Sequence, residues 1–174
     1  GKKSLISESD GLPGKVVYRL CYYDGALYMV LGGAKTLLAR FDLVSRKSEI
    51  IASSGTMNSK NEIDGKPIDY TGLIPDTKRK CIWVGGSIRV NENTRSITIS
   101  HHLWRYDPAK GTFAERDELI APRANLHDMD KFSPAVLDQD FLFQWPFLVK
   151  IEDGTTLALP KINGYSKQDI GFGD

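Results

Sequence analysis

Three segments of the chain repeat one order of turns and strands, and this repeat restricts the fold more than any other feature. Each copy has an acidic turn, then a short apolar strand, then a strand that ends basic–apolar–acidic. In chain order these strand ends are Arg40-Phe41-Asp42, Arg105-Tyr106-Asp107 and Lys150-Ile151-Glu152. Such self-similarity indicates supersecondary units that bury their surfaces against one another.

The repeated unit is predicted to be a four-stranded antiparallel sheet. Runs rich in Val, Ile, Tyr, Phe and Trp alternate with turn signals such as Asp24-Gly25, whereas helical periodicity is scarce. The run 27–31 is apolar without alternation, as expected where neighbouring units cover both faces of a sheet. We therefore predict an all-β fold, a β-propeller in one domain or segment over 1–174, with recognisable blades at about 16–52, 70–116 and 133–160.

Four strands are predicted in each copy, ordered from the innermost to the outermost strand of a blade. They lie at 16–22, 27–31, 36–42 and 49–52; at 70–75, 81–90, 96–107 and 112–115; and at 133–137, 141–145, 147–152 and 156–159. The middle copy is longer, since Asp76 and Asp107 lie 31 residues apart against 18 for Asp24 and Asp42. Period-two alternation predicts that the extra residues extend the second and third strands as a β-hairpin at 87–96.

Three blades do not close a ring, because propellers generally have four to eight. Residues 1–15 and 161–174 could furnish parts of a fourth blade. Otherwise the chain is a segment of a larger propeller, or identical chains complete a ring together. An open arrangement would expose the apolar faces of the terminal blades and favour association.

The longest connections are predicted to share one face of the propeller. Up-and-down strand order places 53–69, 117–132 and the hairpin on that face, and only short turns on the opposite face. Long loops on a rigid scaffold commonly carry binding groups. The ligand-binding candidates on this face are Arg123, His127, Asp128, Asp130, Asp64, Lys66 and Trp145. The alternative is that the loops are solvated linkers and that Trp145 packs in an aromatic core instead of stacking on a sugar ring.

No motif indicates catalysis, a metal or a cofactor. His127 with Asp128 and Asp130 lacks a second anchored ligand group, so we expect no metal there. The Ser-His-His run at 100–102 falls within a predicted strand, where His101 is expected to pack between blades. The repeated basic–acidic pair is expected to be structural in every blade, and a function there would require one copy to differ.

Charge and hydropathy exclude two classes of partner. The formal net charge is +1 and the longest basic run is 78–80, which gives no footprint for nucleic acid or a membrane surface. No apolar stretch approaches the roughly 20 residues that span a bilayer. The chain starts without Met, so we expect that a start codon, with any targeting segment, has been removed, and the N-terminus does not reveal the compartment.

The two cysteines show no framework spacing. A disulfide between Cys21 and Cys81 is one alternative, but buried free thiols are the favoured prediction. Trp83 and Trp104, within two of the apolar strands, are expected in the core.

The middle copy resembles the blade repeat of the two-component-regulator type of propeller. The resemblance rests on 81–86 (CIWVGG) and 103–113 (LWRYDPAKGTF), roughly a quarter of the chain, and extends loosely to the first copy. Gly86 stands where that family usually has Thr, and the hairpin splits the motif. The resemblance implies a periplasmic or extracellular protein that senses a ligand.

Two functional hypotheses follow. The first is a non-enzymatic propeller that presents loops to a glycan, peptide or protein partner. The second is a propeller enzyme acting on polysaccharide, as a lyase or glycoside hydrolase, which would need paired carboxylates or a His/Arg base with a metal near the ring axis. Convergence of Arg123, His127 and Asp128 in one pocket with a partner from the third blade would favour the enzyme, and scattered placement on a flat face would favour binding. A third possibility is a purely structural repeat fragment, which would show no pocket.

Overall fold

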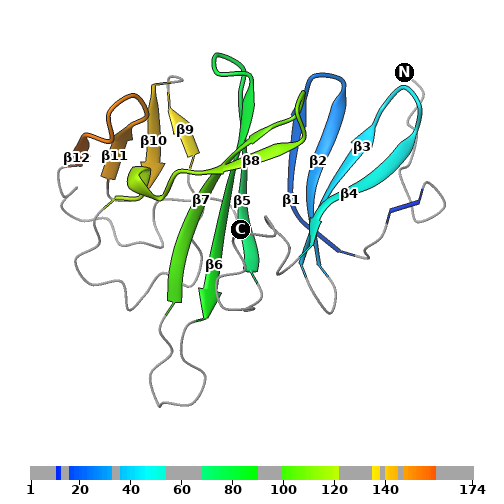
Figure 1. The fold of residues 1–174 in the computed structure, drawn as a ribbon, viewed down its shortest axis with the longest axis horizontal. Coiled ribbons are helices and arrows are strands. Elements are labelled where there is room, and N and C mark those ends of the chain that lie inside the picture. Colours follow the sequence, from blue (N-terminus) through cyan, green and yellow to red (C-terminus); the bar gives the residue numbers. More distant parts are fainter. Residues whose placement is uncertain are drawn as a thin grey trace, which may run out of the picture.

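The chain folds into three four-stranded antiparallel sheets that lie side by side in the computed structural model (Figure 1). The structure describes residues 11–12, 16–32, 36–53, 68–89, 99–121, 135–137, 140–144 and 147–159. Within these residues the only helical element is one short 3-10 turn, η2 (Asp117–Leu119), and no helix is long and apolar enough to cross a membrane. The predicted all-β class is therefore confirmed.

Each sheet keeps its strands in chain order. The first sheet contains β1 (Val16–Tyr23), β2 (Ala26–Gly32), β3 (Leu37–Asp42) and β4 (Lys47–Ser53). The second contains β5 (Ile68–Asp76), β6 (Cys81–Arg89), β7 (Ile99–Asp107) and β8 (Thr112–Glu115). The third contains β9 (Ala135–Leu137), β10 (Phe141–Gln144), β11 (Phe147–Lys150) and β12 (Thr156–Ala158).

The predicted strands agree with these bounds to within a few residues, with one clear error. The third strand of the last copy was expected to reach residue 152, but β11 ends at Lys150. A turn begins there because the Lys150 carbonyl accepts a hydrogen bond from the Gly154 N–H at 2.8 Å. Most of the hairpin predicted at 87–96 lies outside the described residues, and the described strands close no ring.

An acidic residue at or just after the end of the third strand of each sheet accepts hydrogen bonds in a turn. The Asp42 carboxylate accepts hydrogen bonds from the Val44 and Ser45 N–H groups at 3.0 and 2.8 Å. Asp107 accepts from the next turn in the same way, and these bonds close the connections into β4 and β8. In the third sheet this role passes from the expected position 152 to Asp153, which accepts from the Thr155 N–H at 2.9 Å.

The innermost strands of the first two sheets share a β-bulge at the same register. Counting from the hairpin turn, β1 pairs five residues with β2 before Tyr18 is skipped. β5 likewise pairs five residues with β6 before Thr71 is skipped. The two bulges also contact each other, because Arg19 Nε, next to the skipped Tyr18, donates to the carbonyl of the skipped Thr71 at 3.1 Å.

Two apolar clusters hold the three sheets together. The first lies between the first and second sheets and includes Tyr28, Val30 and Trp104. The second lies between the second and third sheets and includes Trp83 and Leu142. Both tryptophans are almost completely buried, as the sequence predicted. The second sheet therefore has both faces covered, which explains why residues 81–87 of β6 are buried throughout.

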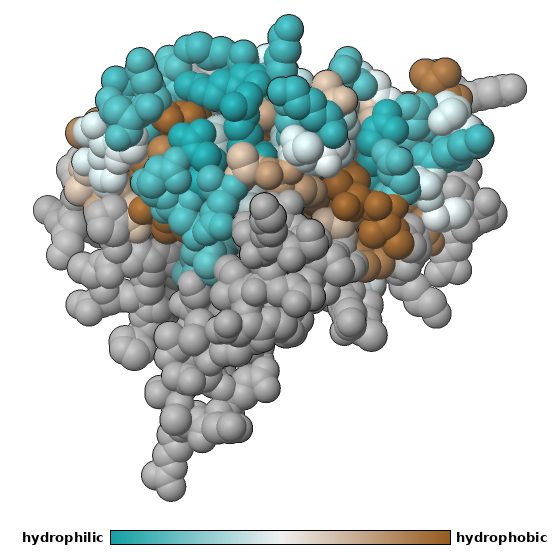
Figure 2. Space-filling model, viewed as in Figure 1, coloured by the Kyte–Doolittle hydropathy of each residue, from teal (hydrophilic) through white to brown (hydrophobic). Residues whose placement is uncertain are grey.

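The outward face of the first sheet is less well covered. Its two central strands, β2 and β3, form a small cluster of Met29, Leu31, Ala39 and Phe41, with Leu12 packed against it. On β1 the apolar side chains are exposed by about half, from 48% to 61%, at Val16, Val17, Tyr18, Leu20 and Tyr22. Figure 2 shows hydrophobic surface gathered on the half of the molecule that holds this sheet.

Candidate ligand-binding site

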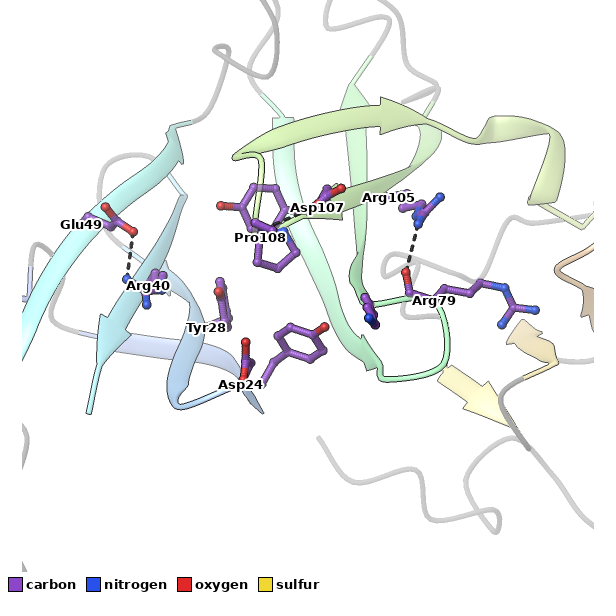
Figure 3. A pocket seen from close by; sticks show the side chains of 12 residues that line it. Asp24, Tyr28, Arg40, Glu49, Arg79, Arg105, Asp107 and Pro108 are labelled. Atoms are coloured by element: carbon purple, nitrogen blue, oxygen red, sulfur yellow. Dashed lines mark hydrogen bonds and ion pairs between the residues drawn. The ribbon is translucent and has the colours of Figure 1, made fainter. Parts of the chain in front are cut away.

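A pocket opens between the first and second sheets, on the side of the short turns (Figure 3). Its volume is about 620 Å³. Three hairpin turns contribute to its rim, at Asp24, at Arg79 and Lys80, and at Pro108. The strand ends that lead into the predicted long loops lie on the opposite side, so the cavity lies away from the face that the sequence singled out. Hydrophilic residues predominate on this side of the surface (Figure 2).

A row of aromatic rings crosses the pocket from one sheet to the other. The rings of Tyr23 and Tyr28 meet edge to face with centroids 6.4 Å apart, and Tyr28 meets Tyr106 in the same manner at 6.2 Å. Tyr106 in turn lies 4.6 Å from Phe113. Alternation along β2 and β7 brings Tyr28 and Tyr106 to the facing sides of their sheets, and the register of the sheets then places them together.

Burial keeps these phenols protonated. Loss of solvent raises the pKa of Tyr106 to about 12, and it also raises the pKa of Tyr28 and Tyr23. In Tyr28 the hydrogen bond from the Arg40 guanidinium opposes this effect without cancelling it. At neutral pH the phenols therefore serve as hydrogen-bond donors and apolar ring faces, and not as bases.

Charged groups of both signs line the same pocket. Arg40 is held by two carboxylates, Asp42 at 2.9 Å and Glu49 at 3.3 Å. Arg105 occupies the equivalent place in the second sheet, yet its Nη2 donates to the Arg79 carbonyl at 3.0 Å. Among the described residues, Arg105 Nε is buried without a hydrogen-bond partner. Arg105 is thus held by a backbone carbonyl where Arg40 is held by carboxylates.

The repeated basic–acidic pair is therefore not uniform. It forms in the first sheet between Arg40 and Asp42, and in the third between Lys150 and Glu152 at 3.5 Å. In the second sheet Asp107 instead lies 3.5 Å from Lys110. One copy does differ, which is the condition that the sequence set for a function at this position.

A buried network supports the rim of the pocket at Arg79. Asp76, which is 1% exposed, accepts hydrogen bonds from Trp83 Nε1 at 3.0 Å and from the Arg79 guanidinium at 3.1 Å. The same carboxylate accepts from the Arg79 N–H at 2.9 Å. Because Trp83 is fixed in the core, this network fixes the turn that carries Arg79 and Lys80.

A second polar group lies on the outer part of the second sheet. Ligand atoms of His102, Glu115 and Asp117 all fall within 4.8 Å of one another, and they form the one group of three possible metal ligands among the residues described. His102 Nδ1 lies 2.7 Å from the Asp117 carboxylate. The sequence led us to expect His101 to be packed, but it is His102 that is buried, with its ring stacked on that of Trp104 at a centroid distance of 5.6 Å.

Both cysteines are buried free thiols, as the sequence favoured. Burial raises the pKa of the Cys21 thiol to about 12, and it also raises the pKa of Cys81. Neither thiol is therefore prepared to act as a nucleophile at neutral pH.

The candidates named from sequence fall in the part of the chain that the structure leaves undescribed. This applies to Asp64, Lys66, Arg123, His127, Asp128, Asp130 and Trp145. Their role in binding stays a prediction. The pocket residues were missed because they sit in short turns and strand ends, although the basic run at 78–80 and the repeated tyrosines were visible signals.

Comparison with known proteins adds no assignment to this geometry. The chain matches no protein-family model, no curated protein and no solved structure.

Proposed function

We propose that the three sheets are blades of a β-propeller and that the chain is a non-enzymatic binding module. The proposal for the fold is supported by adjacent innermost strands, since β1 lies against β5 and β5 against β9. It is supported as well by the bulge that β1 and β5 share. A ring could then be completed by further sheets or by identical chains. The periplasmic or extracellular location implied by the resemblance remains a prediction.

The ligand site in this proposal is the pocket between the first and second sheets, and its ligand is a glycan. The observation that carries this choice is the tyrosine row beside paired charges. Tyr23 offers a partly exposed ring face for stacking on a sugar ring, and the buried rings of Tyr28 and Tyr106 line the pocket beside it. Arg105 and Glu49 offer a donor and an acceptor for hydroxyl groups.

The charge of the lining fits an uncharged ligand better than a strongly ionic one. Arg40, Arg79, Lys80 and Arg105 are offset by Asp24, Glu49 and Asp107, so both signs are present in similar number. A ligand rich in hydroxyl groups can satisfy both kinds of group at once. Binding is favoured over catalysis because the raised pKa values of Tyr28 and Tyr106 disfavour a tyrosine base.

A glycan array with two matched variants tests the site. Ala109→Trp adds bulk at an exposed turn residue that lines the pocket, and Ala114→Trp adds the same bulk at an exposed residue of β8 outside it. We expect the first variant to bind the recognised glycan at least tenfold more weakly and the second to bind as the wild type does. Because neither change removes a packed side chain, circular dichroism should show both variants folded.

Two results would contradict the proposal. Equal binding by wild type and Ala109→Trp would remove this pocket from the site. Binding to a peptide library with no glycan recognised would keep the module but show that the ligand class is wrong.

A further inference from the structure

We propose that His102, Glu115 and Asp117 form a binding site for a divalent transition-metal ion of the zinc class. This site is independent of the tyrosine pocket. An imidazole nitrogen and two carboxylate oxygens are ligands that zinc accepts, with the remaining position open to water. The three ligand atoms already lie within 4.8 Å of one another.

Strand register brings the three side chains to one face of the second sheet. Trp104 pairs with Glu115 across β7 and β8, and His102 lies two residues before Trp104 on the same face. The chain continues alongside β7 past the end of β8, because the Arg116 N–H donates to the Leu103 carbonyl at 2.8 Å. Asp117 thereby reaches the position opposite His102.

Two of the three ligands are held before any ion binds. The Leu103 N–H donates to Asp117 Oδ1 at 2.8 Å, which leaves Oδ2 facing His102 Nδ1 at 2.7 Å. The imidazole plane is fixed by stacking on Trp104, with 27° between the rings. A site with fixed ligands loses little conformational freedom when it takes up an ion.

The third ligand is an exposed side chain. Glu115 lies at the edge of the sheet, and its side chain is hydrogen-bonded to that of Asp117. Ligand atoms in a tetrahedral zinc site lie about 3.3–3.6 Å apart. Uptake of an ion therefore requires the contact of 2.7 Å between His102 Nδ1 and Asp117 Oδ2 to widen and the Glu115 carboxylate to approach, which its exposed position allows.

The pairing of two carboxylates is a second reason to expect a cation. Glu115 and Asp117 are both acids, and two carboxylates in contact repel each other unless a proton or a cation lies between them. A divalent ion would neutralise both at once. The imidazole selects for zinc-class ions, because magnesium and calcium prefer oxygen ligands.

Calorimetric titration of the EDTA-treated 174-residue chain with zinc chloride tests the proposal. We expect one Zn²⁺ bound per chain in the wild type and affinity reduced at least tenfold in Glu115→Gln and Asp117→Asn. The matched control is Glu118→Gln, which removes one negative charge from the same segment without touching the three ligands. Its affinity should stay within twofold of wild type.

Additional measurements keep the proposal falsifiable if Asp117→Asn fails to fold. Glu115→Gln alters an exposed side chain, so its fold should survive, and the ¹⁵N signals of the His102 ring should shift on zinc addition in the wild type. The proposal is overturned if Glu115→Gln binds zinc as Glu118→Gln does, or if stoichiometric binding leaves the His102 signals unmoved. Equal affinity for Mg²⁺ would also overturn it, because imidazole ligation would then be contradicted.

Discussion

The two junctions between sheets are built from the same repeat but are closed in different ways. Between the second and third sheets, the turn residues Lys78 and Arg79 reach Asp140 at 2.5 and 3.6 Å. Between the first and second sheets, the corresponding turns carry Asp24 and Lys80 and flank the pocket. The turns of the second and third sheets are joined by an ionic contact, whereas the turns of the first and second sheets are separated by a pocket with aromatic rings in its lining.

The junctions differ below the turns as well. Gln144 is buried and bonds to the segment after β8, since its Nε2 donates to the Leu119 carbonyl at 2.7 Å and its Oε1 accepts from the Ala121 N–H at 2.8 Å. The first and second sheets are instead joined where Arg19 and Thr36 donate to carbonyl groups of β5. The comparison indicates that the repeat leaves room for a site where no ion pair joins the turns of neighbouring sheets.

The largest expected effect comes from removing Asp76, whose hydrogen bonds fix the turn that contacts the third sheet. Asp76→Ala would leave Trp83 Nε1 and the Arg79 guanidinium without their buried acceptor. We expect the free energy of unfolding to fall by about 3 kcal/mol, measured by urea denaturation. Asp69→Ala, at an exposed position of the same strand, is the control and should change it by less than about 0.5 kcal/mol. Equal effects of the two substitutions would show that the network does not stabilise this junction.

An intermediate effect is expected from a substitution of Gly86, which lets Trp104 and Ile68 pack closely in the cluster between the first and second sheets. A Cβ on Gly86 would lie 2.8 Å from Trp104 Cζ3 and 2.9 Å from Ile68 Cγ2. Gly86→Ala should therefore lower the free energy of unfolding by about 1–3 kcal/mol in urea titrations. Combining it with Trp104→Phe removes part of the clash, so the double variant should lose less than the sum of the two single losses. Strict additivity would argue against the clash as the cause.

The smallest effect concerns the ionic contact between turns. The hydrogen bond from Lys78, together with the nearby positive charges, holds the pKa of Asp140 below its ordinary value. A carboxyl whose pKa is lower in the folded state adds stability above its unfolded pKa, and this stability is lost as the pH falls through the folded pKa. Asp140→Asn should thus slightly lower the urea midpoint at pH 7, and the difference should vanish in acid. A difference that persists below pH 3 would point to packing instead of charge.

Sequence predicted strands and turns well because these depend on neighbouring residues. Asp24-Gly25 forms the expected hairpin turn, with both residues at positive φ. The pocket could not be found in this way, since Tyr28 and Tyr106 belong to different repeats and meet only when the sheets pack. The seven loop candidates remain predictions, because the structure does not describe their segments.

The choice between adjacent histidines shows a second limit of sequence reasoning. Alternation places His101 and His102 on opposite faces of β7, and both faces of the second sheet are covered. Periodicity therefore gives no preference between them. What selects His102 is the carboxylate of Asp117, whose position depends on the register of β8 and the turn that follows.

Gly86 also explains a departure from the repeat that the sequence resembles. A threonine at this position would place branched atoms against Trp104 and Ile68, where the structure has room for a hydrogen only. Gly86 therefore allows Trp104 and Ile68 to pack closely against the backbone of β6.

The shared bulge shifts the alternation of side chains by one residue within β1 and β5. Between the hairpin turn and the skipped residue, side chains alternate between the two faces of the sheet. Beyond Tyr18 in β1 and Thr71 in β5, the positions that face a given side change from odd to even numbers or the reverse. Deleting either residue would keep the pairs on both sides of it, such as Val17 with Leu31, but would remove the local bend and added twist that a bulge gives to the strand.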